Sequence, residues 1–231
     1  MKAGYRGPIY THPASRDLAR IMLKDAGYLN EKEAEWDNRK RQRKHLPLLE
    51  PLYTLQEAQA AMRRFKAVAY GETVEIVKGV KLRLSDAGHI LGSAIAELWL
   101  EEGGVQRKIV FSGDLGHKGA PILRDPATVN EADLVVMEST YGDRAHRSWE
   151  ATWAELDEVF AAMQQGRGNI LIPAFAVGRT QELLYAFKRN YRRWDLDRWA
   201  IFLDSPMAIE ATEVYSYHYE LFDREAGAER R

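Results

Sequence analysis

The sequence contains no cysteine among its 231 residues. Disulfide bonds, zinc sites built from thiolates and cysteine nucleophiles are therefore excluded. Any metal ion that this chain binds must be held by histidine, aspartate or glutamate. The sequence also has no apolar run long enough to span a membrane, and its first residues lack the apolar core of a signal peptide. We therefore expect a cytoplasmic protein without a membrane partner.

The chain also lacks an excess of positive or negative charge. The chain has 33 Lys and Arg against 34 Asp and Glu, a net charge of −1. No global positive field attracts nucleic acid, so any RNA or DNA contact must come from a local patch. Two basic stretches stand out, residues 39–45 and 188–193. Each has a simpler interpretation as the solvated end of a helix, where cations offset the helix dipole.

Two common signatures of hydrolases are missing. No G-x-S-x-G elbow occurs, which argues against a serine hydrolase, and no G-x-x-x-x-G-K-[ST] loop occurs, which argues against a P-loop nucleotidase. Apolar residues, in contrast, are abundant: 45% of the chain is hydrophobic, and six residues are tryptophan. That composition is sufficient for a sizeable packed core, in one large domain or parts of two.

The first third of the chain has helical and strand signals. Residues 8–11 are typical of a short strand, and a helix is expected from near Ser15. The highly charged stretch 31–44 indicates a solvated helix or a helical connector. Thr54 and Glu57 have the spacing of a capping box, which predicts that a further helix begins there.

The remainder indicates an α/β protein. Alternating apolar residues from about 73 to 140 predict a sheet with a β-hairpin, and the apolar run 134–137 is typical of a strand buried on both faces. Beyond a boundary near residue 145, helices and strands alternate, which favours a doubly wound layer. The expected elements there are helices at 148–166, at 180–191 and from 207, and strands at 169–172 and 199–203.

His89 and Asp114 each lie in a glycine-rich turn after a predicted strand. Imidazole and carboxylate are ligand types of hydrolytic zinc sites, and a strand end holds such a ligand rigidly. The two residues are separated by about one hairpin, so neighbouring strands can bring them together. Taken singly, such a histidine is more often structural, and such an aspartate is a common turn residue. Two ligands also fall short of the three that a catalytic zinc site requires.

Three further polar residues follow predicted strands. Glu138 comes directly after the apolar run at 134–137, where a carboxylate can act as general base, orient a metal ligand or simply stabilise a turn. Arg179 opens a predicted helix, where backbone N–H groups favour an anion and a guanidinium adds a phosphate contact. Ser205 also lies between a predicted strand and a predicted helix. It is a candidate for capping that helix and for donating a hydrogen bond to a phosphate.

Five ordered motifs together resemble those of the metallo-β-lactamase/β-CASP family of RNA- and DNA-processing nucleases, nearest to its prokaryotic RNA-metabolising branch. The motifs are D-A-G-H-I-L-G-S-A at 86–94, F-S-G-D-L-G at 111–116, E-S-T-Y-G-D-R at 138–144, P-A-F-A-V-G-R-T-Q-E at 173–182 and L-D-S-P-M-A at 203–208. The resemblance implies an αββα metallo-β-lactamase sandwich with two zinc ions, capped by a Rossmann-like β-CASP domain. Residues 1–145 then form part of the sandwich, and residues 146–231 form the first part of the cap.

The resemblance also implies roles for individual residues. His89 corresponds to a zinc ligand, Asp114 to the carboxylate that bridges both metals, and Glu138 to an acidic residue close to the scissile phosphate. Arg179 and Ser205 remain candidates for substrate binding. The implied activity is zinc-dependent hydrolysis of RNA, by endonucleolytic or exonucleolytic cleavage, in processing or decay. Single-stranded DNA is a further candidate substrate, and homodimers are frequent in the family.

The sequence departs from the family in its metal ligands. The H-x-H-x-D-H motif, which supplies most of them, and the two later histidine motifs of the cap are absent. His12, His117, His146 and His218 do not match ligand positions. The resemblance therefore predicts an incomplete chain that is marginally stable, binds zinc weakly and does not cleave RNA when isolated.

Two alternative functions stay open. The first is a non-catalytic RNA-binding or scaffold partner of an active homologue; the missing ligand motif favours it, whereas the presence of His89, Asp114 and Glu138 argues against it. The second is another hydrolase of the metallo-β-lactamase fold, acting on thioesters or lactams. The segments at 178–182 and 204–208 favour a nuclease over this second alternative.

Overall fold

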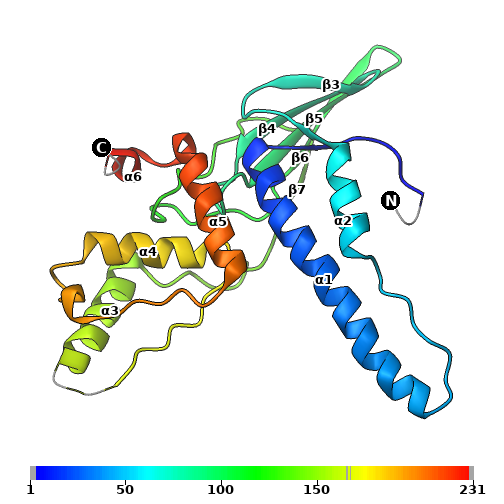
Figure 1. Cartoon of the computed structure of the whole chain (residues 1–231). Helices are drawn as coiled ribbons and strands as arrows, with labels where there is room; N and C mark the ends of the chain where they lie inside the picture. Colours follow the sequence, from blue (N-terminus) through cyan, green and yellow to red (C-terminus); the bar gives the residue numbers. More distant parts are fainter. Residues whose placement is uncertain (1–3, 165, 167, 229–231) are drawn as a thin grey trace. The chain divides into compact units, whose positions relative to one another are not determined.

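The computed structural model describes residues 4–164, 166 and 168–228 (Figure 1). The chain divides into two compact units, residues 1–69 and residues 70–231. The boundary expected near residue 145 concerns a further division within the second unit and stays a prediction. None of the described helices is long and apolar enough to cross a membrane.

The first unit is built on one long helix. Its elements are β1 (Ile9–Thr11), α1 (Pro13–Arg43), α2 (Leu55–Ala61), a 3₁₀ turn (Met62–Arg64) and β2 (Phe65–Ala67), and β1 pairs with β2 in parallel. The predicted helix start and the charged stretch thus form a single helix. The predicted capping box is confirmed: the hydroxyl of Thr54 accepts from the N–H of Glu57 at 3.1 Å, and the Glu57 carboxylate accepts from the N–H of Thr54 at 2.9 Å.

The described part of the second unit contains a five-stranded sheet and four α-helices. They are β3 (Thr73–Val77), β4 (Val80–Asp86), β5 (Ala94–Glu102), β6 (Val105–Phe111), β7 (Leu134–Val136), α3 (Trp149–Gln164), α4 (Arg179–Arg189), α5 (Pro206–Tyr217) and α6 (Arg224–Ala228). The strands lie in sequence order, antiparallel except for β7, which runs parallel to β6. This mixed α/β architecture confirms the predicted fold class, and β5 and β6 form the predicted hairpin.

The register of the sheet brings the polar turns to one edge. Asp86, the last residue of β4, lies opposite Ala94, and Ala96 lies opposite Phe111, the last residue of β6. Phe111 in turn lies beside Val136, the last residue of β7. Because β4, β6 and β7 run in the same direction, the turns that follow all three strands emerge at the same edge.

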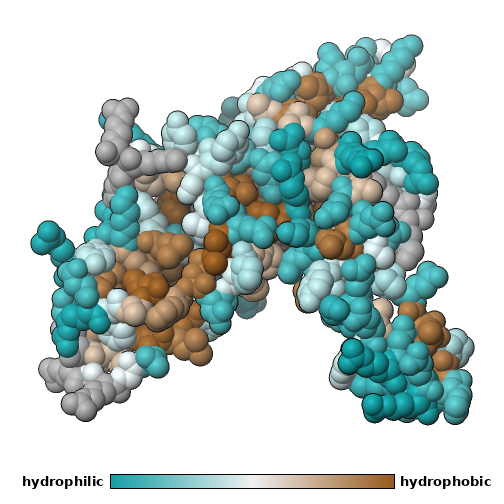
Figure 2. Space-filling model, in the orientation of Figure 1, coloured by the Kyte–Doolittle hydropathy of each residue, from teal (hydrophilic) through white to brown (hydrophobic). Residues whose placement is uncertain are grey.

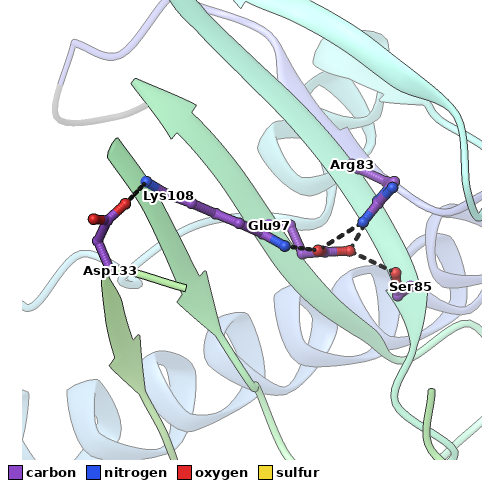
Figure 3. Close-up of polar contacts among 5 residues, drawn as sticks. All are labelled: Arg83, Ser85, Glu97, Lys108 and Asp133. Atoms are coloured by element: carbon purple, nitrogen blue, oxygen red, sulfur yellow. Dashed lines mark hydrogen bonds and ion pairs between the residues drawn. The ribbon is translucent and has the colours of Figure 1, made fainter. Parts of the chain in front are cut away.

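A buried carboxylate ties three strands together. Glu97 in β5 is 1% exposed and accepts two hydrogen bonds from the guanidinium of Arg83, at 2.9 and 2.8 Å (Figure 3). The hydroxyl of Ser85 donates a third at 2.9 Å, and the ammonium group of Lys108 in β6 lies 2.7 Å away. Burial by itself raises the pKa of Glu97, but these donors outweigh burial and lower the pKa to about 2.

Two apolar clusters lie within the second unit. One joins Ala87, Ile95 and Val110 beneath the sheet edge that carries the polar turns. The other surrounds Trp194, which is 2% exposed and whose ring stacks on Phe160 of α3 at 4.7 Å between centroids. The first cluster makes the edge of the sheet rigid, and the second packs α3 against α4.

Several expected strands differ in the structure. Residues 169–172 and 199–203 do not form strands, so the prediction of strands there is wrong. The residues of β7 are 46–57% exposed, which contradicts burial on both faces. Leu171 and Phe202 are 92% and 86% exposed, and apolar surface gathers around α3 and α4 in Figure 2. No described strand pairs with these segments, and an apolar segment cannot form a sheet without a neighbouring strand.

Candidate functional site

The turn that carries His89 is held by local hydrogen bonds. The Asp86 carboxylate accepts from the N–H of Gly88 at 2.8 Å, and the Ser93 hydroxyl accepts from the N–H of His89 at 3.0 Å. The hydroxyl of Tyr70 donates to the carbonyl of Ser93 at 2.6 Å. Gly88 has a φ of +62°, a conformation that favours glycine. These contacts fix the backbone around His89, whose side chain is exposed.

The loop that carries Asp114 packs directly on that turn. The N–H of Gly116 donates to the carbonyl of Ala87 at 2.8 Å. A Cβ atom at Gly116 would lie 1.7 Å from the carbonyl oxygen of Gly88, so only glycine permits this approach. Asp114 itself is exposed. The two glycine-rich motifs therefore meet through their backbones, as expected. The strands that they follow, β4 and β6, are not neighbours, because β5 lies between them.

Glu138 connects the same loop to the end of β7. Its carboxylate accepts from the N–H of Leu115 at 2.5 Å, and its own N–H donates to the hydroxyl of Ser112 at 3.2 Å. The Leu115 N–H and the Thr140 hydroxyl hold the pKa of Glu138 below its ordinary value, with a smaller contribution from His89. Glu138 is therefore a carboxylate at neutral pH, and it lies between the segments of His89 and Asp114.

The first turn of α4 faces the His89 turn. Arg179 lies there and forms an ion pair with Glu182 at 2.9 Å. Burial raises the pKa of Glu182, whereas Arg179 and His89 act in the opposite direction. His89 is thus within electrostatic reach of two carboxylates, Glu138 and Glu182. Glu182 had no predicted role, although its position one turn after Arg179 places both side chains on the same face of the helix.

Helix α5 is hydrogen-bonded to the His89 turn and to α4. Ser205 caps this helix, and its hydroxyl accepts from the N–H of Ala208 at 3.2 Å, so the predicted cap is present. The hydroxyl of Tyr215 accepts from the N–H of Leu91 in the His89 turn at 3.2 Å. The amide of Gln181 donates to the hydroxyl of Thr212 at 2.9 Å, which joins α4 to α5. Tyr215 thus positions the His89 turn, and Gln181 positions α4 against α5. Neither role was predicted from the sequence.

We expect Tyr215→Phe to destabilise the chain by about 1–3 kcal/mol, because the buried N–H of Leu91 loses its acceptor. Tyr215 is 4% exposed, so water does not readily replace the hydroxyl. Tyr217→Phe is the matched control, since Tyr217 is 75% exposed. Urea unfolding curves of both variants measure the difference. Equal stability of the two would show that the Tyr215 hydroxyl does not hold the turn.

The described residues do not complete a metal site by themselves. Among residues 4–164, 166 and 168–228, no three His, Asp or Glu side chains lie close enough together to hold an ion. His89 and Asp114 offer the right kinds of ligand atom, but a catalytic zinc needs at least three protein ligands. This donor set alone therefore does not fit a catalytic metal ion.

Comparison with known proteins finds one matching family model and several similar proteins. A family model described as Beta-Casp domain matches residues 180–230. Ribonuclease TTHA0252 of Thermus thermophilus is 34% identical over 227 residues, which cover 98% of this chain and 47% of that protein. Transcription termination factor FttA of Methanocaldococcus jannaschii is 31% identical over 226 residues, 96% of this chain and 33% of that protein. FttA of Pyrococcus abyssi is 31% identical over 225 residues, which cover 95% of this chain and 32% of that protein.

The chain thus spans about half the length of the ribonuclease and about a third of the termination factors. Nearly all of its residues take part in these similarities, including both glycine-rich turns and the first turn of α4. The family is metal-dependent. The family model at residues 180–230 and these relatives confirm the predicted resemblance to the β-CASP family, in agreement with the motifs at residues 86–94, 111–116 and 178–182.

Proposed function

We propose that this chain is part of a metal-dependent ribonuclease that acts in RNA processing or decay in the cytoplasm. One observation carries the proposal: the segments of His89, Asp114 and Glu138 meet at one sheet edge, linked by the Gly116–Ala87 and Leu115–Glu138 hydrogen bonds. A relative named as a ribonuclease matches this region as part of a 227-residue similarity. That convergence of imidazole and carboxylate groups is suited to metal-assisted phosphodiester hydrolysis.

Within this proposal, His89 and Asp114 are ligands of a metal site that further ligands complete, and Glu138 lies next to the reacting phosphate or orients a ligand. A metal ion held by these residues together with further ligands would activate a water molecule and offset charge on the phosphate. Arg179, 55% exposed on its side chain, offers its guanidinium to the RNA backbone. Ser205 has its hydroxyl at the N-terminus of α5, where a phosphate oxygen is also favoured.

The finer parts of the proposal follow the family resemblance. Zinc is the proposed metal, with two ions per site, and single-stranded DNA is a second substrate to be tested beside RNA. A homodimer is the proposed assembly. Residues 1–145 are assigned to the metallo-β-lactamase part and residues 146–231 to the β-CASP part. The family match at 180–230 supports the second assignment.

The test is a graft of this chain into ribonuclease TTHA0252 in place of the matched segment. We expect the folded graft to cleave a labelled single-stranded RNA in the presence of divalent metal. Asp114→Asn in the graft should lower kcat/KM by roughly 100-fold or more, because the neutral amide loses a metal-ligating carboxylate. Asp37→Asn, an exposed substitution in α1, is the matched control and should have no effect.

A graft that melts cooperatively and cleaves RNA equally well with Asp114→Asn would contradict the proposed role of Asp114. If the large graft does not fold, a smaller graft of residues 86–116 carries Asp114→Asn, with the exposed substitution Glu102→Gln as its control. A non-catalytic RNA-binding partner is the second candidate function, favoured by the lack of a three-ligand cluster among the described residues. A folded graft that binds RNA but never cleaves it would support that candidate.

A further inference from the structure

Charge is distributed unevenly between the two units. Residues 1–69 contain 14 Lys and Arg against 8 Asp and Glu, a net charge of +6. Residues 70–231 contain 19 Lys and Arg against 26 Asp and Glu, a net charge of −7. The unit with the candidate site is therefore acidic, although the proposed substrate is a polyanion. The net charge of the first unit favours the attraction of RNA, whereas the net charge of the second unit repels phosphates at a distance.

The positive charge of the first unit is concentrated at the end of α1. Five cations lie there within six positions, and the next carboxylate along the chain is Glu50; the cations are Arg39, Lys40, Arg41, Arg43 and Lys44. Hydrophilic residues dominate this end of the helix in Figure 2. Arg41 has a structural contact, since its guanidinium donates to the carbonyl of Pro47 at 2.6 Å. Asn38 exchanges hydrogen bonds with the backbone of Leu49, both at 2.8 Å.

The contacts of Asn38 and Arg41 hold the returning segment on one side of the helix. The opposite side carries aromatic and basic residues at helical spacing, which we call the basic-aromatic face. Its members are Tyr28, Lys32, Trp36, Arg39, Lys40, Arg43 and Lys44. Positions three, four, seven and eight after Trp36 all carry cations, so they lie on the same side as its indole. The hydrogen bonds of Asn38 and Arg41 to the returning segment involve none of these residues.

Aromatic rings and cations alternate along this face. Tyr28, Lys32, Trp36 and Lys40 follow one another at intervals of four residues. The ammonium group of Lys32 lies 5.7 Å from the centroid of the Tyr28 ring, and that of Lys40 lies 3.0 Å from the Trp36 ring. Lys32 also forms an ion pair with Glu35 at 2.9 Å. Tyr28 and Trp36 are 49% and 59% exposed, so both offer ring surface to a ligand.

We propose that the basic-aromatic face binds single-stranded RNA. The proposal rests on the proposed function. Exposed aromatic rings allow bases to stack, and interleaved cations neutralise the phosphates between them. Tyr28 and Trp36 are eight residues apart, which is about 12 Å along a helix. Because every base has a flat face, such a surface binds RNA without sequence preference.

The test measures binding of the whole chain to a short fluorescent oligouridylate by anisotropy, in EDTA, so that cleavage does not contribute. Trp36→Ala should weaken binding about 5- to 150-fold, and Trp36→Phe should restore most of the loss. The triple variant Arg39→Gln, Lys40→Gln, Arg43→Gln should reduce the salt dependence of binding by about two units of log K per log salt. The control is the triple variant Lys78→Gln, Lys81→Gln, Arg192→Gln, which removes the same charge from exposed positions of the second unit. It should change neither the affinity for RNA nor the salt dependence of binding.

Two outcomes would overturn the proposal: no loss of affinity in the Trp36 and Arg39 variants, or an equal loss in the control triple variant. RNA binding absent from the wild-type chain, together with salt-dependent self-association, would instead assign the face to a second copy of the protein. Far-UV circular dichroism confirms that α1 is intact in each variant. The failure of this proposal is separable from that of the proposed function, since cleavage by the graft is measured independently.

Discussion

Gly116→Ala should destabilise the chain by about 3 kcal/mol or more, because the added methyl group overlaps the neighbouring backbone. The new Cβ would lie 1.7 Å from the carbonyl oxygen of Gly88 and 2.8 Å from the backbone nitrogen of His89. Backbone atoms cannot turn away as a flexible side chain can. The His89 turn and the Asp114 loop must therefore separate, and the 2.8 Å hydrogen bond from Gly116 to Ala87 is weakened.

Chemical unfolding of the variant measures this effect, and amide exchange at residues 87–90 measures whether it is local. Gly227→Ala is the matched control: nothing lies within 4 Å of its added Cβ, and it is in helix α6. Alanine there should be neutral or stabilise by up to about 1 kcal/mol. If Gly116→Ala lowered the free energy of unfolding by less than about 0.5 kcal/mol, the His89 turn and the Asp114 loop would not be in backbone contact.

Glu97→Ala should destabilise the chain by about 3 kcal/mol, because it leaves Lys108 and Arg83 without their shared carboxylate. Lys108 is 11% exposed and bears most of the cost, whereas Arg83 is 37% exposed and is partly hydrated. Glu97→Gln retains the shape without the charge and should fall between wild type and alanine. Glu101→Ala, an exposed position on the same strand, should have little effect.

The same carboxylate predicts the acid stability of the sheet. The pKa of Glu97 is lowered to about 2 in the folded chain from an ordinary value near 4.5. Its contribution is therefore fully present above about pH 4.5 and is lost as the pH falls towards 2. Stability of the wild-type chain should decrease across that interval, and Glu97→Gln should show a smaller decrease. An identical pH profile for the two proteins would contradict the role of the ionised carboxylate.

Elements with a local cause were predicted well from the sequence. The capping box of Thr54 and Glu57 needs only residues three positions apart, and the hairpin of β5 and β6 needs only a short turn between alternating strands. The predicted fold class is confirmed for the same reason. The strands expected at 169–172 and 199–203 did not form, because a strand depends on a partner that may lie anywhere in a chain.

Sequence alone determined the chemistry of the candidate site: which residues carry imidazole and carboxylate groups, and which glycines precede or follow them. Only the tertiary structure decided that Gly116 contacts the Gly88 carbonyl, that Glu138 accepts from Leu115, and that His89 lies near Glu182. These contacts join residues up to about 90 positions apart in the sequence. Residue type is a local property that any sequence states directly, whereas proximity depends on strand register and packing, which arise only when the whole sheet is assembled.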